Sequence, residues 1–580
     1  MIAELIGKKI FDSIPIDKLN DLDLLNSLQK NIGIIENQTK VKSVKFKNSD
    51  IYEKDCEKQN TTIFNQAPNG LWYNWANSSG KKYFAVTYSA GVTQILQSEY
   101  TIPEAPLVYI YNKDQINADK EVKPKYEIRL TGYQSIRSAL MIDDVCEPYL
   151  LLGTFTYPKK EVVPHCAILK YSFKKGIVEE IIKIENSNSI KNLKRYINKD
   201  KCIDVIIYTK NNDFFSNTLA SLYYIKTKYV SNFNNITDYV KIKNLTNQHI
   251  DIFGNVWFIE FDKKTIYLSI SLQEVDSSKL SGFTIKGRFY YNKISNLFDN
   301  DIEEFSLISL IGNEVYPAGF GIESISAFQI QTTKKSEYIY LYSLSDMLYQ
   351  VLGFINNPES NISQYFENIT DFFSFVNAIR EIVANLDFDG TRIFVLNKKD
   401  LYKSSYPIIK TIIGNAPPKT INLSCTNNGF NNFLNVYTWS STSDKCQNEL
   451  YFGTLDLRAT IYTSFANIIK SINPVLSEIL LSLPNQIIIQ LTEYFLNINF
   501  SYPIDFTNTE LYFDIIKIDE KHNITKLTSN GFSNIENLGL FDSGIRNLNI
   551  IKNCNGKFLL SGTTCYQVDN SAKIYITVLK

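Results

Sequence analysis

Residues 383–403 read VANLDFDGTRIFVLNKKDLYK and carry the clearest structural signal in the chain. An apolar run, Val383–Leu386, leads to Asp389-Gly390, which is followed by the alternating segment Thr391–Asn397. Asp-Gly favours positive φ and therefore the short turns that join antiparallel strands. The stretch predicts a tight β-hairpin, with Gly390 at positive φ.

The same plan recurs along the chain as pairs of short apolar strands. The predicted strands are Val41–Phe46, Lys82–Ser89, Leu107–Tyr111, Tyr126–Leu130, Tyr149–Tyr157, Cys166–Phe173, Asp204–Thr209, Leu222–Ile225, Val256–Phe261, Thr265–Ile270, Phe283–Tyr291, Ile325–Ile330, Tyr338–Ser343, Phe433–Trp439, Leu450–Leu455, Lys557–Gly562 and Ile574–Leu579. Successive units start roughly 50 to 70 residues apart, near the period of propeller blades. We predict an all-β dominated fold: a β-propeller of about seven blades with a helical insertion.

The two ends of the chain should close this array. We expect Ile574–Leu579 to pair with a strand from the first 90 residues, because such closure removes exposed sheet edges. Within each unit, apolar first strands and more polar later ones predict inner strands that are covered on both faces and a solvated outer edge.

Composition agrees with strands and excludes some partners. Tyr (37) and Phe (36) are abundant and favour strands over helices. Lys+Arg and Asp+Glu both number 60, so the formal charge is zero and general nucleic-acid binding is not indicated. A neutral chain repels itself little, which suits a protein that works in an assembly.

Helical spacing appears in two regions. A short helix is predicted over Ile16–Ile32, and a further helical candidate is Phe372–Val383. Three apolar runs, punctuated by Pro474 and Pro484, then follow one another. These runs are Ala459–Ser471, Val475–Leu483 and Ile487–Leu496. They predict either an insertion packed on the sheets or an apolar arm used for oligomerisation.

These features divide the chain into four predicted parts. Residues 1–47 form an N-terminal helix and lead-in strand, and 48–456 form the propeller blades. Residues 457–545 form a mostly helical insertion, and 546–580 form the closing strands.

The eight cysteines lie far apart and contain no C-x-x-C pair, which favours buried thiols in a reducing compartment over disulfides or zinc. His165-Cys166 is better explained as a strand edge than as a metal site. The N-terminus lacks the order of a signal peptide, and no apolar stretch is long enough to span a bilayer as a helix. We expect synthesis in a cytoplasm.

Candidate catalytic groups are few. The tight acidic pairs are Asp143-Asp144, Asp387 with Asp389, and Glu303-Glu304. Turn chemistry explains Asp387 and Asp389 better than catalysis does, and adjacent acids such as Asp143 and Asp144 point different ways. No phosphate-binding loop and no G-x-S-x-G motif occurs. The sequence therefore predicts no catalytic, cofactor-binding or metal-binding residues, and no enzyme.

Three other motifs have a structural and a binding interpretation. Gly319-Phe320-Gly321 is expected in a turn rather than in a ligand cradle. Lys191–Lys201 is the densest basic run, and we expect a solvated loop rather than a nucleic-acid contact. The aromatic cluster Trp72-Tyr73-Asn74-Trp75 can stack a sugar or line the entry to the first sheet, and the second interpretation is favoured.

Two resemblances follow from these observations. The segment Leu386–Asn397 resembles blades of the large β-propeller class with an Asp-Gly-Thr turn between apolar strands, and Asn555–Leu560 resembles a degenerate second copy. The architecture as a whole resembles nozzle-type tail proteins of short-tailed phages, in which propeller-bearing chains repeat around the tail tube. That resemblance implies a virion component made in a host cytoplasm.

The predicted function is accordingly a non-enzymatic structural protein. It would form a symmetric homo-oligomeric ring with other virion proteins, or with scaffold proteins, and would need no cofactor. Two alternatives stay open: a cytoplasmic propeller scaffold that binds partners, and a carbohydrate-active propeller enzyme.

Overall fold

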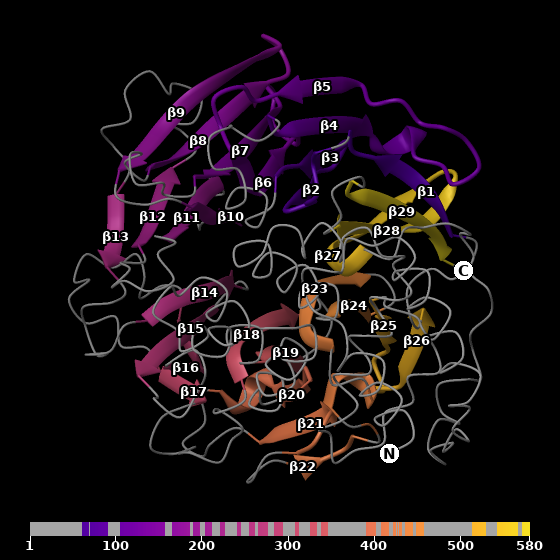
Figure 1. Ribbon diagram of the computed structural model, residues 1–580. Helices are drawn as coiled ribbons and strands as arrows, with labels where there is room; N and C mark the ends of the chain where they lie inside the picture. The colour runs from indigo at the N-terminus through magenta and orange to yellow at the C-terminus, as the bar shows by residue number, and fades with distance from the viewer. Residues whose placement is uncertain are drawn as a thin grey trace, which may run out of the picture.

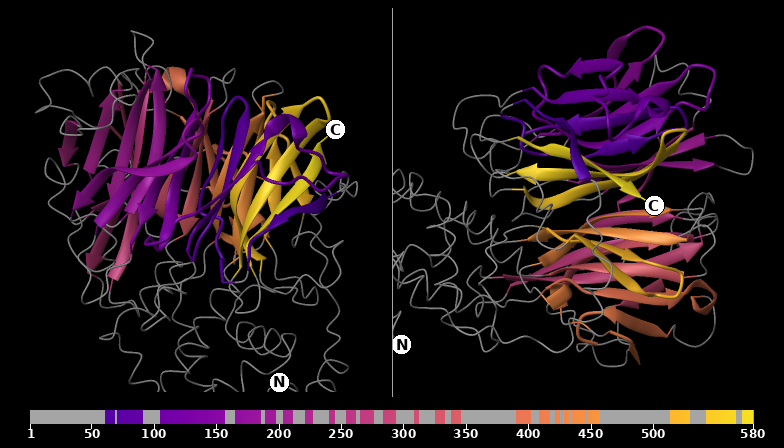
Figure 2. Two further views of the ribbon diagram at one scale, coloured as in Figure 1. Left: turned by 90° about the horizontal axis from the view of Figure 1, so that it is seen from above. Right: turned by 90° about the vertical axis from the view of Figure 1, so that its right-hand side faces the viewer.

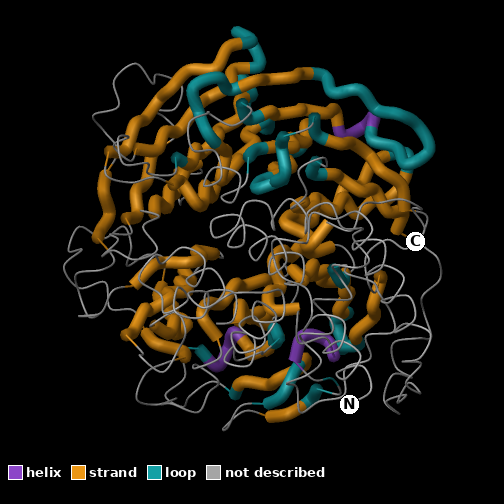
Figure 3. Tube along the Cα trace, in the orientation of Figure 1, coloured by secondary structure: helices purple, strands orange, loops and turns teal. Residues whose placement is uncertain are grey.

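In the computed structural model, the described part of the chain is built almost entirely from strands. The described residues are 61–68, 70–90, 105–156, 165–185, 189–197, 203–210, 221–226, 240–244, 254–261, 265–275, 283–293, 308–311, 325–332, 338–345, 390–401, 408–416, 421–424, 426, 428–431, 435–444, 448–456, 513–528, 542–565 and 571–579. Strands dominate these ranges, and the helical turns among them are short 3-10 turns (Figure 3). None of the described helices has the length and apolar character needed to cross a membrane.

The described strands pair into seven antiparallel groups, which we call blades 1 to 7. Blade 1 contains β2 (Asn77–Ser79), β3 (Tyr83–Tyr88), β4 (Leu107–Asn112) and β5 (Tyr126–Arg129). Blade 2 contains β6 (Ser135–Ile142), β7 (Tyr149–Phe155), β8 (His165–Ser172) and β9 (Ile177–Glu185). Blade 3 contains β10 (Ser189–Ile197), β11 (Ile203–Lys210), β12 (Ser221–Lys226) and β13 (Val240–Asn244).

The remaining blades follow the same plan. Blade 4 contains β14 (Gly254–Phe261), β15 (Thr265–Val275), β16 (Phe283–Lys293) and β17 (Ile308–Ile311). Blade 5 contains β18 (Ile325–Thr332), β19 (Tyr338–Ser345), β20 (Ile393–Asn397) and β21 (Ile409–Ile413), with the short β22 (Ile421–Asn422) beside β21. Blade 6 contains β23 (Asn435–Asp444), β24 (Glu449–Asp456), β25 (Ile515–Ile518) and β26 (Ile524–Thr528). Blade 7 contains β27 (Asp542–Asn553), β28 (Gly556–Cys565), β29 (Lys573–Leu579) and β1 (Thr61–Gln66).

The blades are arranged around a common axis. The first strands of blades 1 to 7 are β2, β6, β10, β14, β18, β23 and β27, and each contacts the first strand of the next blade, with β27 returning to β2. Figure 1 shows these strands on the inner side of the ring, and Figure 2 shows the same blades from above and from the side. The chain is therefore a β-propeller. The total of seven blades stays a prediction for the whole chain, because the seven groups are counted among the described residues only.

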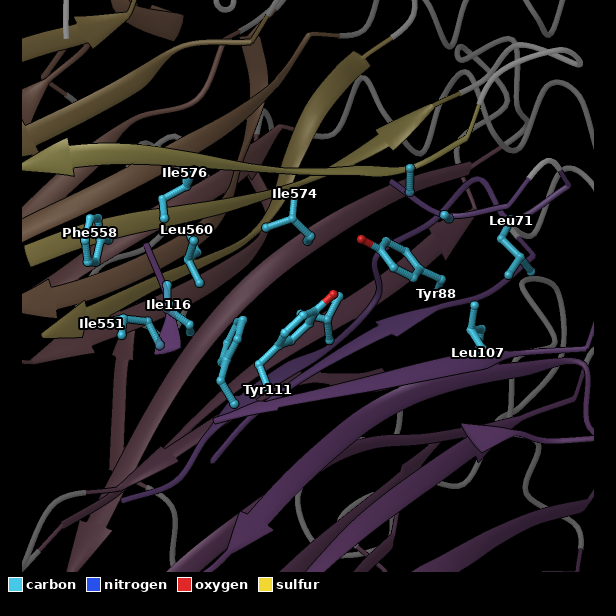
Figure 4. Close-up of a cluster of buried hydrophobic side chains, with 14 residues drawn as sticks. Leu71, Tyr88, Leu107, Tyr111, Ile116, Ile551, Phe558, Leu560, Ile574 and Ile576 are labelled. Carbon is cyan, nitrogen blue, oxygen red and sulfur yellow. The ribbon is translucent and has the colours of Figure 1, made fainter. Parts of the chain in front are cut away.

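The ring is closed by segments from opposite ends of the sequence. β1 pairs antiparallel with β29, from Thr61↔Thr577 to Gln66↔Lys573, which confirms the predicted closure. A buried cluster lies beneath this seam, where Leu71, Tyr88 and Tyr111 pack with Leu560 and Ile576 (Figure 4). Burying such large apolar side chains contributes roughly 1.5–3 kcal/mol each relative to exposure.

Burial falls from the inner to the outer strands of a blade. All residues of β3 and β7, the second strands of blades 1 and 2, are buried. The outer strands β5 and β26 are half-buried or exposed at most positions. Blades stack face to face, so inner strands are covered on both faces while outer strands meet solvent. The predicted polarity gradient is confirmed in these blades.

The stretch around Gly390 differs from the prediction. Val383–Asp389 lies outside the described residues, and β20 pairs with β19 and β21. Gly390 is not among the described residues with positive φ, so the Asp-Gly turn geometry is wrong at this position. A Cβ on Gly390 would lie 2.5 Å from the backbone nitrogen of Gly429. The glycine is required by a close approach between two backbone segments.

The helical predictions fall mostly outside the described residues. These include Ile16–Ile32, Phe372–Val383 and the three apolar runs between residues 459 and 496. Within 457–545, the described parts are strands: β25, β26 and the first residues of β27 belong to blades 6 and 7. The sequence analysis placed these residues in the insertion, outside the blades, whereas β25 and β26 complete the sheet of blade 6.

Candidate functional site: a ring of bulged residues

Six of the seven inner strands carry a β-bulge at an equivalent place. In β6 the pairs Ile136↔Thr154 and Ser138↔Gly153 leave Arg137 as the extra residue. β23 and β27 each carry a second shift of register nearer their first residue. At the place equivalent to Arg137, five further residues are extra to the ladder, one in each of five other inner strands. They are Lys191 in β10, Trp257 in β14, Ser326 in β18, Trp439 in β23 and Arg546 in β27. A bulge redirects a side chain away from the ladder, so the repeat singles out one residue per blade near the axis.

Blade 1 supplies the seventh position. Tyr73 forms an isolated β-bridge with Ser89, whereas Asn77 pairs with Val86. The register changes by one residue between these two pairs, so the extra residue lies around Trp75. We call Trp75, Arg137, Lys191, Trp257, Ser326, Trp439 and Arg546 the bulge ring. Three of these residues are cationic, three are tryptophans and none is acidic.

Four members of the bulge ring contact one another across blades 6, 7, 1 and 2. The guanidinium carbon of Arg137 lies 3.7 Å from the ring centroid of Trp75. The guanidinium carbon of Arg546 lies 5.1 Å from the Trp75 centroid and 5.0 Å from the Trp439 centroid. The result is a ladder in the order Trp439, Arg546, Trp75, Arg137. Both indoles are buried and both arginines are half-buried, so the cations are the part of the ladder that reaches solvent.

Neighbouring side chains hold the tryptophans in place. The Trp75 indole stacks on Tyr73 with centroids 4.4 Å apart, and its Nε1 donates to the carbonyl oxygen of Ala90 at 3.3 Å. Trp439 contacts Tyr437 at 6.0 Å between centroids. With both faces and the edge engaged by protein, Trp75 is a rigid platform.

Two residues after Trp439, Ser441 belongs to a short polar chain that links blades 5 and 6. The Tyr342 hydroxyl is 2.6 Å from Ser441 Oγ, which donates to Gln331 Oε1 at 2.8 Å. Burial raises the pKa of Tyr342 far above its ordinary value, so this phenol stays neutral and serves as a hydrogen-bonding group.

The seams between blades repeat one hydrogen bond next to the bulges. Ser138, which follows Arg137, donates from Oγ to the carbonyl oxygen of Ile190 at 2.7 Å. Ser440, which follows Trp439, donates in the same way to Ile545 at 2.7 Å. At the seam between blades 7 and 1, Asn547 Nδ2 donates to Asn74 Oδ1 at 2.9 Å. These bonds fix each bulge relative to the inner strand of the next blade.

Glycine-threonine pairs on the second strands make room for these seams. A Cβ on Gly153 or Gly453 would lie 2.6 Å from the side chain of Ile190 or Ile545. The following threonines bond the third strands: Ala167 N donates to Thr154 Oγ1 at 2.8 Å, and Asp514 N donates to Thr454 Oγ1 at 2.8 Å. Gly562-Thr563 in β28 is a third copy of the pair, with Lys573 N donating to Thr563 Oγ1 at 3.0 Å.

The acidic pair Asp143-Asp144 has a structural role. Asp143 accepts three backbone N–H groups, from Lys81 and Lys82 at 2.6 Å each and from Tyr83 at 2.7 Å. Asp144 forms an ion pair with Arg195 at 2.8 Å, and the hydrogen bond from Arg195 lowers the pKa of Asp144. These carboxylates join blade 2 to the β2–β3 turn of blade 1 and to blade 3.

The remaining sequence candidates lie partly inside and partly outside the described ranges. Asp387, Asp389, Glu303-Glu304 and Gly319–Gly321 lie outside the described residues. The basic run Lys191–Lys201 was expected to be a solvated loop, which is wrong for residues 191–197, since they belong to β10. There Lys194 pairs with Glu260 at 2.8 Å and Arg195 with Asp144, so the run forms inter-blade ion pairs while Lys191 joins the bulge ring.

Metal-ligating side chains do not gather in the part of the chain that the structure describes. No group of three His, Cys, Asp or Glu residues is placed to hold a metal ion there. His165 is the first residue of β8, and the adjacent Cys166 is buried and forms no disulfide. Cys146 and Cys554 are free and exposed, so the expectation of buried thiols holds for only one of these three described cysteines.

Sequence reasoning found Trp75 but not the ring that contains it. The signal was present as short repeated strings: Ser-Ile-Arg-Ser at 135–138, Ser-Ile-Lys-Asn at 189–192 and Gly-Ile-Arg-Asn at 544–547. A search for repeats of four residues, aligned on the inner strands, would have placed Arg137, Lys191 and Arg546 together.

Comparison with known proteins found distant structural similarity and no sequence relative. No family model matches the chain, and no curated protein is significantly similar to it. Similar solved structures include the GH93 α-L-arabinofuranosidase of Fusarium graminearum (10% identity, 77% of this chain and 95% of that chain, TM-score 0.34). Others are the Penicillium chrysogenum α-L-arabinanase (8%, 74% and 90%, 0.31) and Saccharomyces cerevisiae Sqt1 (8%, 90% and 100%, 0.38).

These comparisons correct two predictions. The similar structures are mainly propeller glycoside hydrolases, which contradicts both the prediction of a non-enzymatic virion component and the prediction that the chain is not an enzyme. The low identities carry no residue role over to this chain. The predictions of ring assembly, partners and compartment are not tested and stay predictions.

Proposed function

We propose that this chain is a carbohydrate-active β-propeller that binds a sugar chain at the bulge ring. The observation that carries the proposal is the ladder Trp439, Arg546, Trp75, Arg137, in which indole faces alternate with guanidinium groups. Guanidinium groups donate paired hydrogen bonds to neighbouring oxygens, and the buried indoles hold these groups in place. Guanidinium groups from successive blades suit the repeated hydroxyl groups of a chain of sugar units.

The position of the ladder supports the same proposal. Its members come from four successive blades, so the fold sets their spacing and little ordering is needed on binding. Glycosidic hydrolysis uses a pair of carboxyl groups, and none of the seven ring positions is acidic. The ring is therefore proposed as the binding part of the site, with any catalytic acids supplied from other positions.

The test is a binding and turnover screen of the full chain against neutral and acidic oligosaccharides, with calorimetry for binding and reducing-end release for turnover. Trp75→Ala should weaken binding at least tenfold, because it removes the central rung of the ladder. The matched control is Trp72→Ala, a similarly buried indole outside the ring. Binding that is lost equally in both variants, with both still folded, would refute the ring as the site.

A further inference from the structure

A cluster of aromatic rings lies at the seam between blades 1 and 2, outside the bulge ring. Tyr83 and Tyr126 are the first residues of β3 and β5 in blade 1. Tyr171 lies near the end of β8 in blade 2, and Phe173 directly follows that strand. The Phe173 ring stacks on Tyr83 with centroids 4.8 Å apart, and it meets Tyr126 edge to face at 5.3 Å. We call Tyr83, Tyr126, Tyr171 and Phe173 the aromatic cage.

Two ammonium groups of the chain lie against the aromatic cage. Lys125 Nζ is 5.3 Å from the ring centroid of Tyr83 and 5.4 Å from that of Tyr126, and it donates to the Tyr83 hydroxyl at 3.2 Å. Lys82 Nζ is 5.4 Å from the Tyr83 centroid. A cation within about 6 Å of an aromatic centroid is attracted by the ring quadrupole. The cage thus holds cations, and the cations it holds here are its own lysines.

The place of the Lys125 ammonium is reached from solvent. Both Lys125 and Lys82 are exposed, and Tyr126 and Phe173 are half-buried. Cation–π contacts at such exposed sites are weak, so the Lys125 side chain can leave the cage and return to water at small cost. A cationic group from solution would then meet the ring surfaces that the ammonium has left.

The rings keep their positions without the Lys125 ammonium. The Tyr83 backbone N–H donates to Asp143 Oδ2 at 2.7 Å, and the Lys125 backbone N–H donates to the carbonyl oxygen of Ile110 at 2.7 Å. Neither bond involves the lysine side chain, so both persist when that side chain moves. A cage that is already assembled loses little conformational entropy when a ligand binds.

The class of cation follows from hydration. A primary ammonium such as that of lysine is compact and strongly hydrated, and its N–H groups need hydrogen-bond acceptors. A quaternary ammonium has no N–H group and presents methyl groups around its charge, which is why clustered aromatic rings recognise it. The cage offers ring surfaces from two blades, and such surfaces suit the quaternary group better than the lysine that now occupies the site.

We infer that the aromatic cage binds a small quaternary ammonium compound, whose charged group takes the place of the Lys125 ammonium. Lys125 is then a built-in competitor that covers the site when no ligand is bound. This site is separate from the bulge ring and does not depend on the proposed function.

The experiment measures binding of the full chain to choline, to tetramethylammonium and to the neutral tert-butyl analogue of choline, in which carbon replaces the charged nitrogen. Calorimetry and ligand-observed NMR give the affinities. Choline should bind about tenfold more tightly than its neutral analogue, because only the charged ligand gains from the ring quadrupoles. Equal binding of choline and the analogue would overturn the inference, and so would a failure of both cations to bind.

The decisive variant is Lys125→Met, which keeps the apolar stem and removes the competing ammonium. Choline affinity should rise by roughly threefold, a gain that a folding defect does not produce. Lys123→Met, at an exposed lysine two residues earlier, is the matched control and should bind as wild type does. Unchanged affinity in Lys125→Met would show that the ammonium does not occupy the ligand's place.

Two further variants assign binding to the rings. Tyr126→Leu removes one wall of the cage and should weaken choline binding about tenfold, whereas Tyr126→Phe keeps the ring and should bind as wild type does. Equal affinities in these two variants would place the choline site elsewhere.

Discussion

The hydroxyl of Ser138 donates a 2.7 Å hydrogen bond to the carbonyl oxygen of Ile190, across the seam between blades 2 and 3. Both groups are buried, and each flanks a bulged cation, Arg137 or Lys191. The bond therefore sets the spacing of two members of the bulge ring as well as the packing of two blades.

Ser138→Ala should destabilise the protein by about 1–2 kcal/mol, because it leaves a buried carbonyl without its donor. Ser440→Ala, at the equivalent seam of blades 6 and 7, should have a similar effect. Denaturant unfolding monitored by tryptophan fluorescence measures the free energy of unfolding of both variants. Ser79→Ala, at an exposed position of β2, is the control, and a loss as large as that of Ser138→Ala would contradict the role of the seam.

Gly390→Ala should destabilise the protein by about 1–3 kcal/mol through overpacking, since the new methyl group would meet the backbone of Gly429. Gly176 is the informative comparison: its φ is positive (68°) and a Cβ there would meet nothing within 4 Å, so Gly176→Ala reports backbone strain alone. Differential scanning fluorimetry separates the variants. An unchanged melting temperature for Gly390→Ala would show that the two backbones do not need their present separation.

Asp143→Ala should cost about 1–3 kcal/mol, because three backbone N–H groups of residues 81–83 would lose a charged acceptor. Asp144→Ala breaks a surface ion pair and should cost no more than about 1 kcal/mol. Thermal melts at neutral pH compare the two. A turnover defect in Asp143→Ala at unchanged stability would contradict the structural role and make this carboxylate a catalytic candidate again.

His522 should make stability depend on pH. Burial lowers the pKa of its imidazole below the ordinary 6.5, the nearby Lys410 lowers it further, and Asp519 partly opposes both. In the folded protein the ring is 3.2 Å from the hydroxyl of Tyr340. The unfolded state thus binds a proton first, so the contribution of His522 is complete above pH 6.5 and is lost as pH falls through 6.5 toward the folded pKa.

The measurement is the melting temperature between about pH 7.5 and 5.5, on either side of the ordinary histidine pKa, in wild type and in His522→Asn. Asparagine tolerates the positive φ of 65° at this position and does not titrate. The variant should lose less stability over this range than wild type does. Identical pH profiles would show that His522 does not contribute.

Much of the sheet architecture was predictable from local patterns. Hairpins such as Val256–Phe261 with Thr265–Ile270 appear as β14 and β15, because a short polar turn and the two apolar strands that it joins are adjacent in the sequence. β6 and β10 were missed, since their inner-strand sequences mix serine, arginine and lysine with the apolar residues. An inner strand of a propeller faces the axis, where polar side chains are tolerated, and strand periodicity weakens there.

The candidate site was not predictable in the same way. Arg137 and Arg546 are far apart in the sequence, and each alone has the pattern of an ordinary surface charge. Only the closure of the ring brings blades 7, 1 and 2 together and places both beside Trp75. The prediction for Gly390 failed for a related reason: the glycine is required by a tertiary contact with Gly429, which a turn rule cannot detect.

Pairing of β1 with β29 also determines when the ring can be completed during synthesis. Blades 1 to 6 draw their strands from consecutive parts of the sequence, whereas blade 7 needs Thr61–Gln66 and Lys573–Leu579 together. Until the ribosome has released the second of these segments, the first has an unpaired edge, and Leu71 and Tyr88 lack their apolar neighbours from blade 7. The nascent chain therefore carries an open seam for most of its translation, and the apolar cluster of blades 7 and 1 can form only after that seam has closed.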